Sequence, residues 1–401
     1  MSSKTAGKID YVSAWYFKAS EYIQHTAIRC AFVSTNSITQ GEQVAAVWKP
    51  LYERFGIHID FAWRTFKWGS ESNDAAAVHC VIVGFSSAEN PGKRKLFLSK
   101  QVVHEVDNIN AYLIESDNVF IESRTKAICD IPKMLSGNRP TDGGYLILSA
   151  DEREGLIKKE PEAEKFIKRF MMGYEFINNI PRYCLWLVNA APSELRKLPL
   201  VTERIALCRK AREESPDEGR RRLAETPTLF REQLNPDRFI ALPKVSSERR
   251  KYIPMGYLDQ NTIAGDKLFI IPDATLYHFG VLNSNVHMAW MRAVTGRLKS
   301  DYSYSINVVY NNFPWCDPTP EQKAKIEETA QAILDARAMF PNDSLADLYD
   351  EAVMPQQLRK AHQANDVAVM KAYGLSTKGD VTEAGCVAFL FEKYRKITEG
   401  K

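Results

Sequence analysis

The sequence predicts an α/β domain that contains part of a doubly wound sheet, followed by an α+β region and a helical C-terminal tail. Three observations favour this fold class. Strand-like apolar runs alternate with helix-like repeats in residues 1–105, short β-type runs and dense turns follow in 106–318, and charged helical repeats fill 319–401. A length of 401 residues suits two or three domains, and we expect their boundaries near these positions.

The first region is predicted to alternate between helices and strands. We expect a helix over about 10–25, a strand at 29–34, a helix at 41–55 and strands at 57–63 and 78–85. The last of these strands is almost continuously apolar, which is typical of a strand covered on both faces. The first helix should carry an aromatic face made of residues at helical spacing, namely Tyr11, Trp15, Ala19 and Tyr22.

The second and third regions differ in their local patterns. Turn-forming residues cluster in the second, for example at 136–140 and 141–144, and separate short β-type runs at 146–148 and 268–271. A charged helical stretch at about 194–214 interrupts them, which predicts an α+β region rich in loops. The tail is predicted to contain three helices, over 324–339, 355–373 and 382–394.

Composition is that of an ordinary folded protein. With 45% hydrophobic and 26% charged residues, the chain is not disordered, collagen-like or a disulfide miniprotein. The net charge is +3, from 53 basic and 50 acidic residues, so binding to nucleic acid would need a local basic surface. No run approaches the ~20 apolar residues of a membrane span, and the N-terminus lacks the apolar core of a signal peptide. Seven scattered cysteines without a C-x-x-C pair predict reduced, mostly buried thiols in a cytoplasmic protein with no membrane partner.

Motifs for several common chemistries are missing from the sequence. It contains no G-x-G-x-x-G and no G-x-x-x-x-G-K-[ST], so the phosphate or cofactor turn of an open α/β sheet is not found. It contains no G-x-S-x-G either. The seven histidines lack metal-ligand or catalytic spacing, so we expect structural or solvated histidines and no metal site. Either the first region has another fold, or the chain starts partway through a larger protein.

The stretch 238–315 has the richest functional pattern. Basic residues, short polar residues and aromatic rings alternate in it, as they do on DNA-reading surfaces, where cations contact phosphates and polar side chains read base edges. The alternative interpretation is a solvated surface with a few core aromatics. Composition alone does not separate the two.

Specific strings in the sequence carry a resemblance to a known family. In chain order, FGVLNS (279–284), HMAW (287–290), GRLKSDYSYS (296–305) and YNNFPW (310–315) closely resemble the target-recognition region of the type IIL, MmeI-like restriction–modification enzymes and their methyltransferase relatives. The first hundred residues resemble the later half of that family's adenine-methyltransferase domain. The resemblance spans roughly 8–318, and its other strings lie at 10–16, 31–43, 78–85, 131–144 and 246–254.

The resemblance implies that the chain is the C-terminal part of an adenine-N6 DNA methyltransferase that uses S-adenosylmethionine. Its partners would be double-stranded DNA and the N-terminal half of the enzyme. In the family, the cofactor turn, the Asn-Pro-Pro-aromatic catalytic loop and the nuclease domain all precede the matching part. We therefore expect no catalytic residue and no cofactor in this chain, and no methyl transfer from it alone. The string 312–315 (NFPW) imitates the catalytic loop but has one proline and follows the recognition region, so we predict a structural turn there.

In this family context, Lys299 and Asp301 are the first candidates for base readout. They are two residues apart, which places them on one face of an extended segment. A lysine donates to guanine O6 and N7, and a carboxylate accepts from the N4 amino group of the paired cytosine. The two side chains would thus read both partners of a G·C pair. The alternative is a surface ion pair.

The same reasoning pairs Lys267 with Ser303 and Lys244 with Asp266. Many relatives carry an arginine where Ser303 stands, so Lys267 is the candidate to reach that base. The other cations of the stretch are expected to be phosphate contacts or structural ion pairs: Arg249, Arg250, Lys251, Arg292 and Arg297.

Two functions from different classes follow. In the first, the chain is the specificity portion of an adenine-N6 DNA methyltransferase or restriction–modification enzyme. In the second, it is a stand-alone, non-catalytic DNA-binding or adaptor protein that keeps only the recognition fold. A third interpretation, an α/β protein unrelated to DNA, predicts no salt-dependent binding to duplex DNA.

Overall fold

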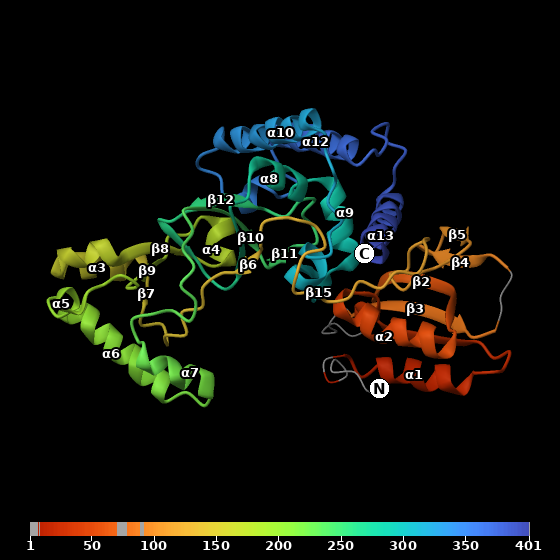
Figure 1. Ribbon diagram of the computed structural model, residues 1–401, viewed down its shortest axis with the longest axis horizontal. Helices are drawn as coiled ribbons and strands as arrows, with labels where there is room; N and C mark the ends of the chain where they lie inside the picture. The colour runs from red at the N-terminus through yellow and green to blue at the C-terminus, as the bar shows by residue number, and fades with distance from the viewer. Residues whose placement is uncertain (1–6, 8, 70–77, 89–91, 401) are drawn as a thin grey trace. The chain divides into compact units, whose positions relative to one another are not determined.

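The computed structural model describes residues 7, 9–69, 78–88 and 92–400. The chain, whose course is drawn in Figure 1, divides into two compact units. Their segments are Met1–Ile131, Ser284–Lys325 and Asp366–Lys401 for unit 1, and Pro132–Asn283 and Ile326–Asn365 for unit 2. Unit 1 combines residues from all three regions of the sequence.

The N-terminal part of unit 1 is a mixed sheet with two helices packed beside each other. The strand order is β1-β3-β2-β4-β5, in which β3 is antiparallel to both of its neighbours and β2 is parallel to β4. The elements are α1 (Ser13–Tyr22), β1 (Cys30–Thr35), the 3-10 helix η2 (Asn36–Thr39), α2 (Gly41–Phe55), β2 (His58–Trp68), β3 (Val78–Ser86), β4 (Arg94–Phe97) and β5 (Val103–Val106).

The structure confirms the five elements predicted here from the sequence and the α/β class, but the sheet is not simply parallel. Strands β1 and β2 point the same way because α2 crosses between them, and β3 then reverses direction and fills the space between them. A doubly wound sheet is mainly parallel. The pattern of apolar residues did not reveal the reversal because a covered strand looks the same in either direction.

The aromatic face predicted for α1 is turned away from the core of unit 1. The side chains of Tyr11, Trp15 and Tyr22 are 82%, 55% and 75% exposed. The opposite side of the helix contributes the fully buried Tyr16, whose ring stacks on Phe85 of β3 at a centroid distance of 5.4 Å. Unit 1 therefore presents an aromatic surface on α1.

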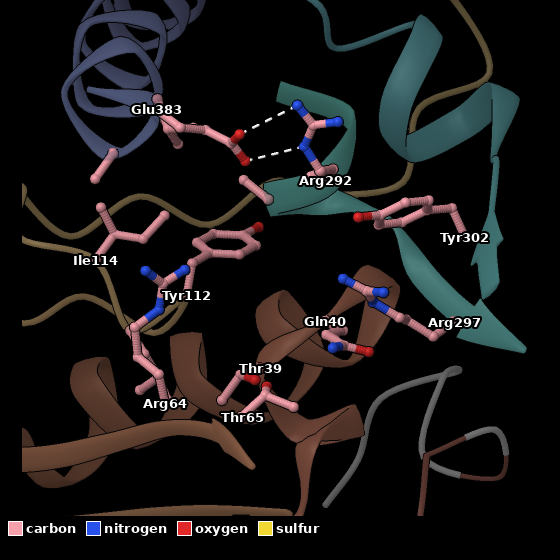
Figure 2. Close-up of a pocket in the computed structure, with 14 residues that line it drawn as sticks. Thr39, Gln40, Arg64, Thr65, Tyr112, Ile114, Arg292, Arg297, Tyr302 and Glu383 are labelled. Atoms are coloured by element: carbon pink, nitrogen blue, oxygen red, sulfur yellow. Dashed lines mark hydrogen bonds and ion pairs between the residues drawn. The ribbon is translucent and has the colours of Figure 1, made fainter. Parts of the chain in front are cut away.

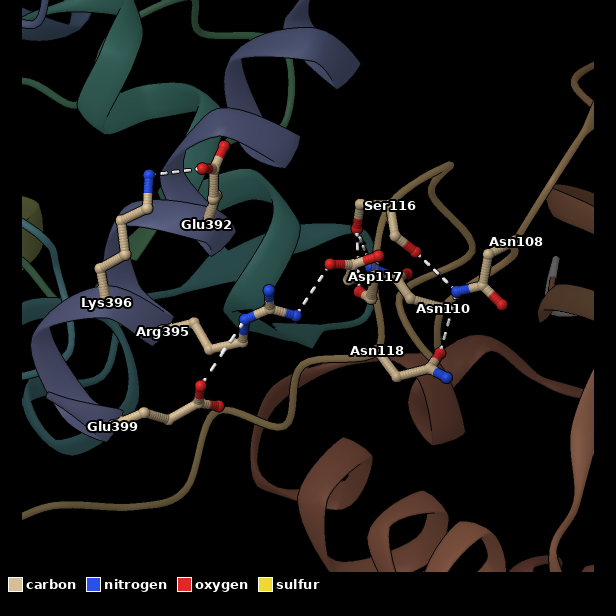
Figure 3. A network of polar contacts seen from close by, with 9 residues as sticks. All are labelled: Asn108, Asn110, Ser116, Asp117, Asn118, Glu392, Arg395, Lys396 and Glu399. Atoms are coloured by element: carbon tan, nitrogen blue, oxygen red, sulfur yellow. Dashed lines mark hydrogen bonds and ion pairs between the residues drawn. The ribbon is translucent and has the colours of Figure 1, made fainter.

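The remainder of unit 1 comes from later parts of the chain. Its elements are α9 (Asn285–Val294), β15 (Gly296–Leu298), β16 (Asp301–Ser303), the π-helical turn η5 (Ile306–Tyr310) and α13 (Glu383–Glu399). Helix α13 packs on α9 and holds the loop that follows β5, as Figure 3 shows. Arg395 donates to the carboxylate of Asp117 at 2.8 Å, and within the loop the Asn108 amide donates to the Ser116 carbonyl at 2.7 Å.

Unit 2 contains two four-stranded sheets, with strand orders β12-β10-β14-β6 and β13-β8-β9-β7. Their strands are β6 (Leu135–Ser136), β7 (Ile147–Leu148), β8 (Ile167–Met171), β9 (Tyr183–Leu185), β10 (Arg238–Pro243), β12 (Gly256–Asp259), β13 (Thr262–Ala264) and β14 (Leu268–Pro272); β11 (Val245–Ser246) follows β10. The helical elements are α3 (Ala150–Lys159), η3 (Pro161–Phe166), α4 (Gly173–Asn178), α5 (Pro192–Leu195), α6 (Pro199–Glu213), α7 (Glu218–Arg222), η4 (Leu223–Glu225) and α8 (Leu276–Leu282).

The predicted elements of this region are also confirmed. The β-type runs correspond to β7 and β14, and the charged stretch at 194–214 corresponds mainly to α6. The tail contains the three predicted helices, α10 (Pro320–Ala338), α12 (Gln356–Ala372) and α13, together with a short α11 (Leu345–Leu348) that was not predicted. The division between the units falls inside α10 and α12.

All seven cysteines are free thiols, and five of them are buried: Cys80, Cys184, Cys208, Cys316 and Cys386. This agrees with the expectation of reduced, mostly buried cysteines. Among the described residues, no helix is long and apolar enough to cross a membrane. The same part of the chain brings no three His, Cys, Asp or Glu side chains together as a metal site.

Candidate nucleic-acid interface

The first candidate readout residues lie on a β-hairpin. Strands β15 and β16 pair antiparallel, with Leu298 opposite Asp301, so Lys299 and Ser300 form the two-residue turn between them. Lys299 has φ +57°, in the left-handed region. The sequence predicted that Lys299 and Asp301 share a face of one extended segment, and this is wrong. Lys299 is in the turn and Asp301 begins the returning strand, which places both at the tip of the hairpin.

Contacts on both sides of the turn hold this hairpin. The Arg297 guanidinium donates to the Ser300 carbonyl at 2.8 Å and lies over the Tyr302 ring at 4.2 Å. The Thr295 hydroxyl, at the end of α9, donates to the Ser303 carbonyl. Lys299 is exposed, while Asp301 and Ser303 are partly exposed. The tip therefore offers a cation and a carboxylate on a braced turn, which suits reading of base edges from the major groove.

Three other candidate readout residues, Lys244, Asp266 and Lys267, lie where β10 ends and β14 begins in unit 2. The Lys244 backbone N–H donates to the Lys267 carbonyl at 3.0 Å, and Lys267 is exposed. Lys244 is partly buried, its ammonium donating to the Ser136 hydroxyl at 2.7 Å and lying over the Phe269 ring at 4.6 Å. Burial lowers the pKa of Lys244, and the Asp266 carboxylate opposes this shift.

Asp266 also has an ion-pair partner that the sequence did not link to it. Its carboxylate accepts from Arg139 Nε at 3.2 Å, so Arg139 is a cation of this cluster that sequence reasoning did not select as a site residue. The string containing Arg139 was recognised only as part of the family resemblance, because nothing in its spacing links residue 139 to residue 266. Lys267 and Ser303 belong to different units, and their proposed joint role stays a prediction.

The candidate phosphate-contacting residues fall into two groups. Arg249 and Lys251 are exposed and Arg250 is partly exposed, and the Lys251 ammonium lies over the ring of the buried Tyr252 at 5.5 Å. In contrast, Arg292 makes a two-pronged ion pair with Glu383, at 3.0 and 3.1 Å. For Arg292 the structure therefore favours the structural ion pair that the sequence left open.

Three family descriptions match the chain one after another. "MmeI, DNA-methyltransferase domain" matches residues 1–98, "MmeI, target recognition domain" matches 115–317 and "MmeI, C-terminal domain" matches 318–400. The target-recognition match alone covers about half of the chain. The chain belongs to the MmeI family. This bears out the resemblance to type IIL restriction–modification enzymes.

Two relatives of this MmeI-family chain cover almost all of it. "DNA methyltransferase A" of Bacillus subtilis (strain 168) is 41% identical over 397 residues, which is 99% of this chain and 45% of that protein. The structure described as that of the type IIL restriction-modification enzyme MmeI in complex with DNA is 45% identical, with a TM-score of 0.90 over 99% of this chain and 54% of that one. The chain thus spans about half the length of these relatives.

The string that imitates a catalytic loop has a structural role in this MmeI-family chain. Asn312 and Phe313 are fully buried. The Asn312 amide donates to the carbonyls of Glu122, Asn307 and Val308 at 2.9, 2.7 and 3.2 Å. These bonds fasten segments that are far apart in the chain, as expected for a structural turn rather than for a loop open to substrate.

Proposed function

We propose that this chain recognises a specific sequence in double-stranded DNA as the specificity portion of an adenine-N6 DNA methyltransferase. That enzyme would use S-adenosylmethionine and belong to a restriction–modification system. The observation that carries the proposal is the braced hairpin, which presents Lys299 and Asp301 at its tip within the segment that matches the MmeI target recognition domain. The MmeI structure in complex with DNA supports DNA as the ligand.

Base readout by the hairpin follows from the chemistry of its tip. Lys299 would donate to O6 and N7 of a guanine, and Asp301 would accept from the N4 amino group of the paired cytosine. Such a pair of contacts gives about 1–3 kcal/mol of discrimination against the wrong base. The rigid turn matters because a side chain that is already positioned loses less conformational entropy when it binds.

The cluster in unit 2 would supply further contacts. Lys267 is exposed and would contact a base, with Ser303 as its proposed companion from the hairpin. Lys244 and Asp266, together with Arg139, would read a second base pair or hold Lys267 in place. Arg249, Arg250 and Lys251 would contact phosphates, which fix the register of the protein on the duplex without reading sequence.

An N-terminal half of the enzyme is the proposed protein partner. Strand β1 is at the edge of its sheet among the described strands, and the aromatic residues of α1 beside it are exposed. An unpaired edge next to an apolar surface suits a continuing sheet. The relatives are about twice as long as this chain, which supports a partner of that size.

We infer that the turn after β1, among the described residues, is not the cofactor turn of an S-adenosylmethionine site. The turn after β1 leads through η2 to Gly41, which has φ +57°. A Cβ atom on Gly41 would lie 3.3 Å from the backbone of Gly296, so this glycine serves close packing rather than an open cradle. We therefore propose that the cofactor turn and the catalytic loop lie in the N-terminal half.

The test is to express this chain together with the N-terminal half of a close relative and map modified adenines by sequencing. The wild-type pair should methylate adenine within one sequence motif. The double variant Lys299→Glu, Asp301→Arg exchanges the cation and the carboxylate, so one motif position should change from guanine to cytosine. Methylation of the old motif should fall about 5- to 150-fold, as expected for 1–3 kcal/mol.

Arg249→Gln is the matched control, because a lost phosphate contact weakens all sequences alike. An unchanged motif in the double variant would overturn base readout by the hairpin. Sequence-specific binding without any methylated base would favour the stand-alone adaptor.

A further inference from the structure

A pocket in unit 1 opens beside the hairpin. It has a volume of about 320 Å³, at the lower end of the range of ligand pockets. Figure 2 shows it between β2, the turn after η2, the first turn of α13 and the hairpin. Its polar lining comes mainly from Gln40, Arg64, Thr65, Arg292, Arg297 and Glu383.

The pocket has an excess of positive charge. Three guanidinium groups face one carboxylate, and Arg292 already neutralises that carboxylate through its two-pronged ion pair with Glu383. The charge of Arg64 then has no carboxylate of its own in the pocket lining. Arginine stays protonated in proteins, so the pocket attracts an anion at every physiological pH.

Arg64 is the residue that points to a ligand. It makes no hydrogen bond or ion pair within the described part of the chain, although it lines a pocket with a carboxylate in it. Arg64 is exposed and so accessible to a ligand. Partial loss of hydration lowers the pKa of its guanidinium, and the field of Glu383 opposes this shift. A bulge in β2 aims the side chain, because the pairing with β3 slips between Trp63 and Phe66 and leaves Arg64 and Thr65 in the irregular step.

Neutral donors surround the Arg64 side chain. The Thr65 hydroxyl accepts a long hydrogen bond from the Asn36 amide at 3.5 Å, which leaves its own proton free to donate. Gln40 adds an amide. Helix α13 begins at the pocket, where its first-turn N–H groups favour negative charge. Cationic, hydroxyl and amide donors around one small space are the chemistry that binds a tetrahedral oxyanion.

We propose that this pocket binds a phosphate group of the DNA backbone, with Arg64 as the main contact. The proposal rests on the proposed function and names a site for it. Arg297 lines the pocket and also donates to the Ser300 carbonyl in the turn beside Lys299. A phosphate held here therefore fixes where the hairpin tip meets the base pairs, which is the role of backbone contacts in specific recognition. Free phosphate has the same chemistry and is the second source to test.

The first experiment measures duplex affinity of the full 401-residue chain against salt concentration. Arg64→Gln should weaken binding about 10- to 100-fold, as expected for loss of a charged hydrogen bond. It should also reduce the slope of log K against log salt by about 0.9, the value of one phosphate contact. Arg64→Lys keeps the charge and should recover most of the slope.

Lys67→Gln is the matched control, because Lys67 is an exposed cation on the same strand that does not line the pocket. Equal affinity and slope for wild type, Arg64→Gln and Lys67→Gln would overturn the proposal. Thermal midpoints show whether each variant folds. If Arg64→Gln does not fold, Thr65→Val and Gln40→Leu are measured in the same way, and an unchanged affinity in both overturns the proposal.

A second experiment separates the two sources of phosphate. Duplexes that carry one neutral methylphosphonate linkage are scanned along the binding site. One linkage should weaken wild type and leave Arg64→Gln unaffected, which identifies the phosphate. Stabilisation of wild type by inorganic phosphate, with no such linkage in the scan, would overturn the assignment to DNA. If wild type binds no duplex at all, the proposed function fails instead, so the two failures are distinguishable.

Discussion

At the scale of single residues, one buried cation holds backbone segments of unit 2 together. Arg212, on α6, is fully buried, and its guanidinium donates five hydrogen bonds to backbone carbonyls. The acceptors are the carbonyls of Pro140, Thr141, Leu223, Thr226 and Leu229, at 2.7–3.0 Å. One side chain thus fixes two loops that are more than seventy residues apart. In the sequence, Arg212 was one of several charged residues on a predicted helix, and nothing marked it as buried.

Replacing Arg212 should destabilise unit 2 strongly. Arg212→Met keeps most of the volume but removes the guanidinium donor from five carbonyl groups, of which only those of Leu223 and Thr226 still accept from a backbone N–H. Each buried group left unsatisfied costs about 1–3 kcal/mol. Because loop movement lets water reach some of them, we expect a loss of at least about 3 kcal/mol in the free energy of unfolding, measured with urea. Arg209→Met, at an exposed position of the same helix, should change it by less than about 0.5 kcal/mol. Similar values for the two variants would contradict this role.

At the scale of elements, patterns of apolar residues located the strands and helices. They did not show the turns that divide a stretch or which elements pack together. The stretch that contains Lys299 was expected to be extended, and a two-residue turn divides it. Glycine would be the usual residue at φ +57°, so a lysine there gave no warning of the turn. Likewise, Arg64 carries no signal in the sequence, because its role depends on a bulge in β2 and on elements that are hundreds of residues away.

The periodicity of apolar residues also did not show where helices pack closely. Gly280 of α8 is buried, and a Cβ atom there would lie 2.7 Å from Cγ2 of Ile326 in α10 and 3.0 Å from the Asn365 side chain in α12. The Asn365 amide also donates to the Gly280 carbonyl at 2.8 Å, and the Thr329 hydroxyl donates to Asn365 at 3.1 Å. Three helices therefore meet at this glycine.

Gly280→Ala should destabilise the protein even though alanine favours helices. The gain in helix propensity is about 1 kcal/mol, whereas overpacking of a buried contact costs about 1–3 kcal/mol, so we expect a net loss of up to about 2 kcal/mol in chemical denaturation. Gly155 is the comparison, because it is exposed in α3 and a Cβ atom there would meet nothing within 4 Å. Gly155→Ala should stabilise by about 0.5–1 kcal/mol. Shifts of the same sign in both variants would count against the packing argument.

At the scale of the whole molecule, segments that are far apart in the sequence pack against each other. Residues 122–128 bond to 307–312: the Arg124 N–H donates to the Asn307 carbonyl at 3.0 Å, and the Asn311 amide donates to the Arg124 carbonyl at 2.7 Å. Such contacts join the beginning of the second region to its end, nearly two hundred residues later. The sequence could supply element types and the family, but long-range pairing of this kind leaves no periodic trace.

Each unit also contains a buried histidine that is held neutral. In unit 1, His287 is fully buried, stacks on Phe313 at 4.8 Å and shares a hydrogen bond with the Tyr304 hydroxyl at 2.9 Å. In unit 2, His362 stacks on Tyr252 at 4.1 Å. Burial lowers the pKa of His287 to about 3, helped by the nearby charge of Arg292, and lowers the pKa of His362 well below its ordinary value.

Acid should therefore weaken both units. Each histidine of the unfolded chain binds a proton near pH 6.5, whereas the buried histidines of the folded chain do not. Their contribution to the free energy of unfolding is therefore fully present above pH 6.5 and is lost as the pH falls toward 3. For His287 alone the loss from pH 7 to pH 5 is about 2 kcal/mol. His287→Gln should lower stability at pH 7 but remove that share of the decline, as measured by urea unfolding at both pH values. His104→Gln, at an exposed site of β5, should follow wild type, and an equal decline in all three proteins would show that His287 is protonated without cost in the folded state.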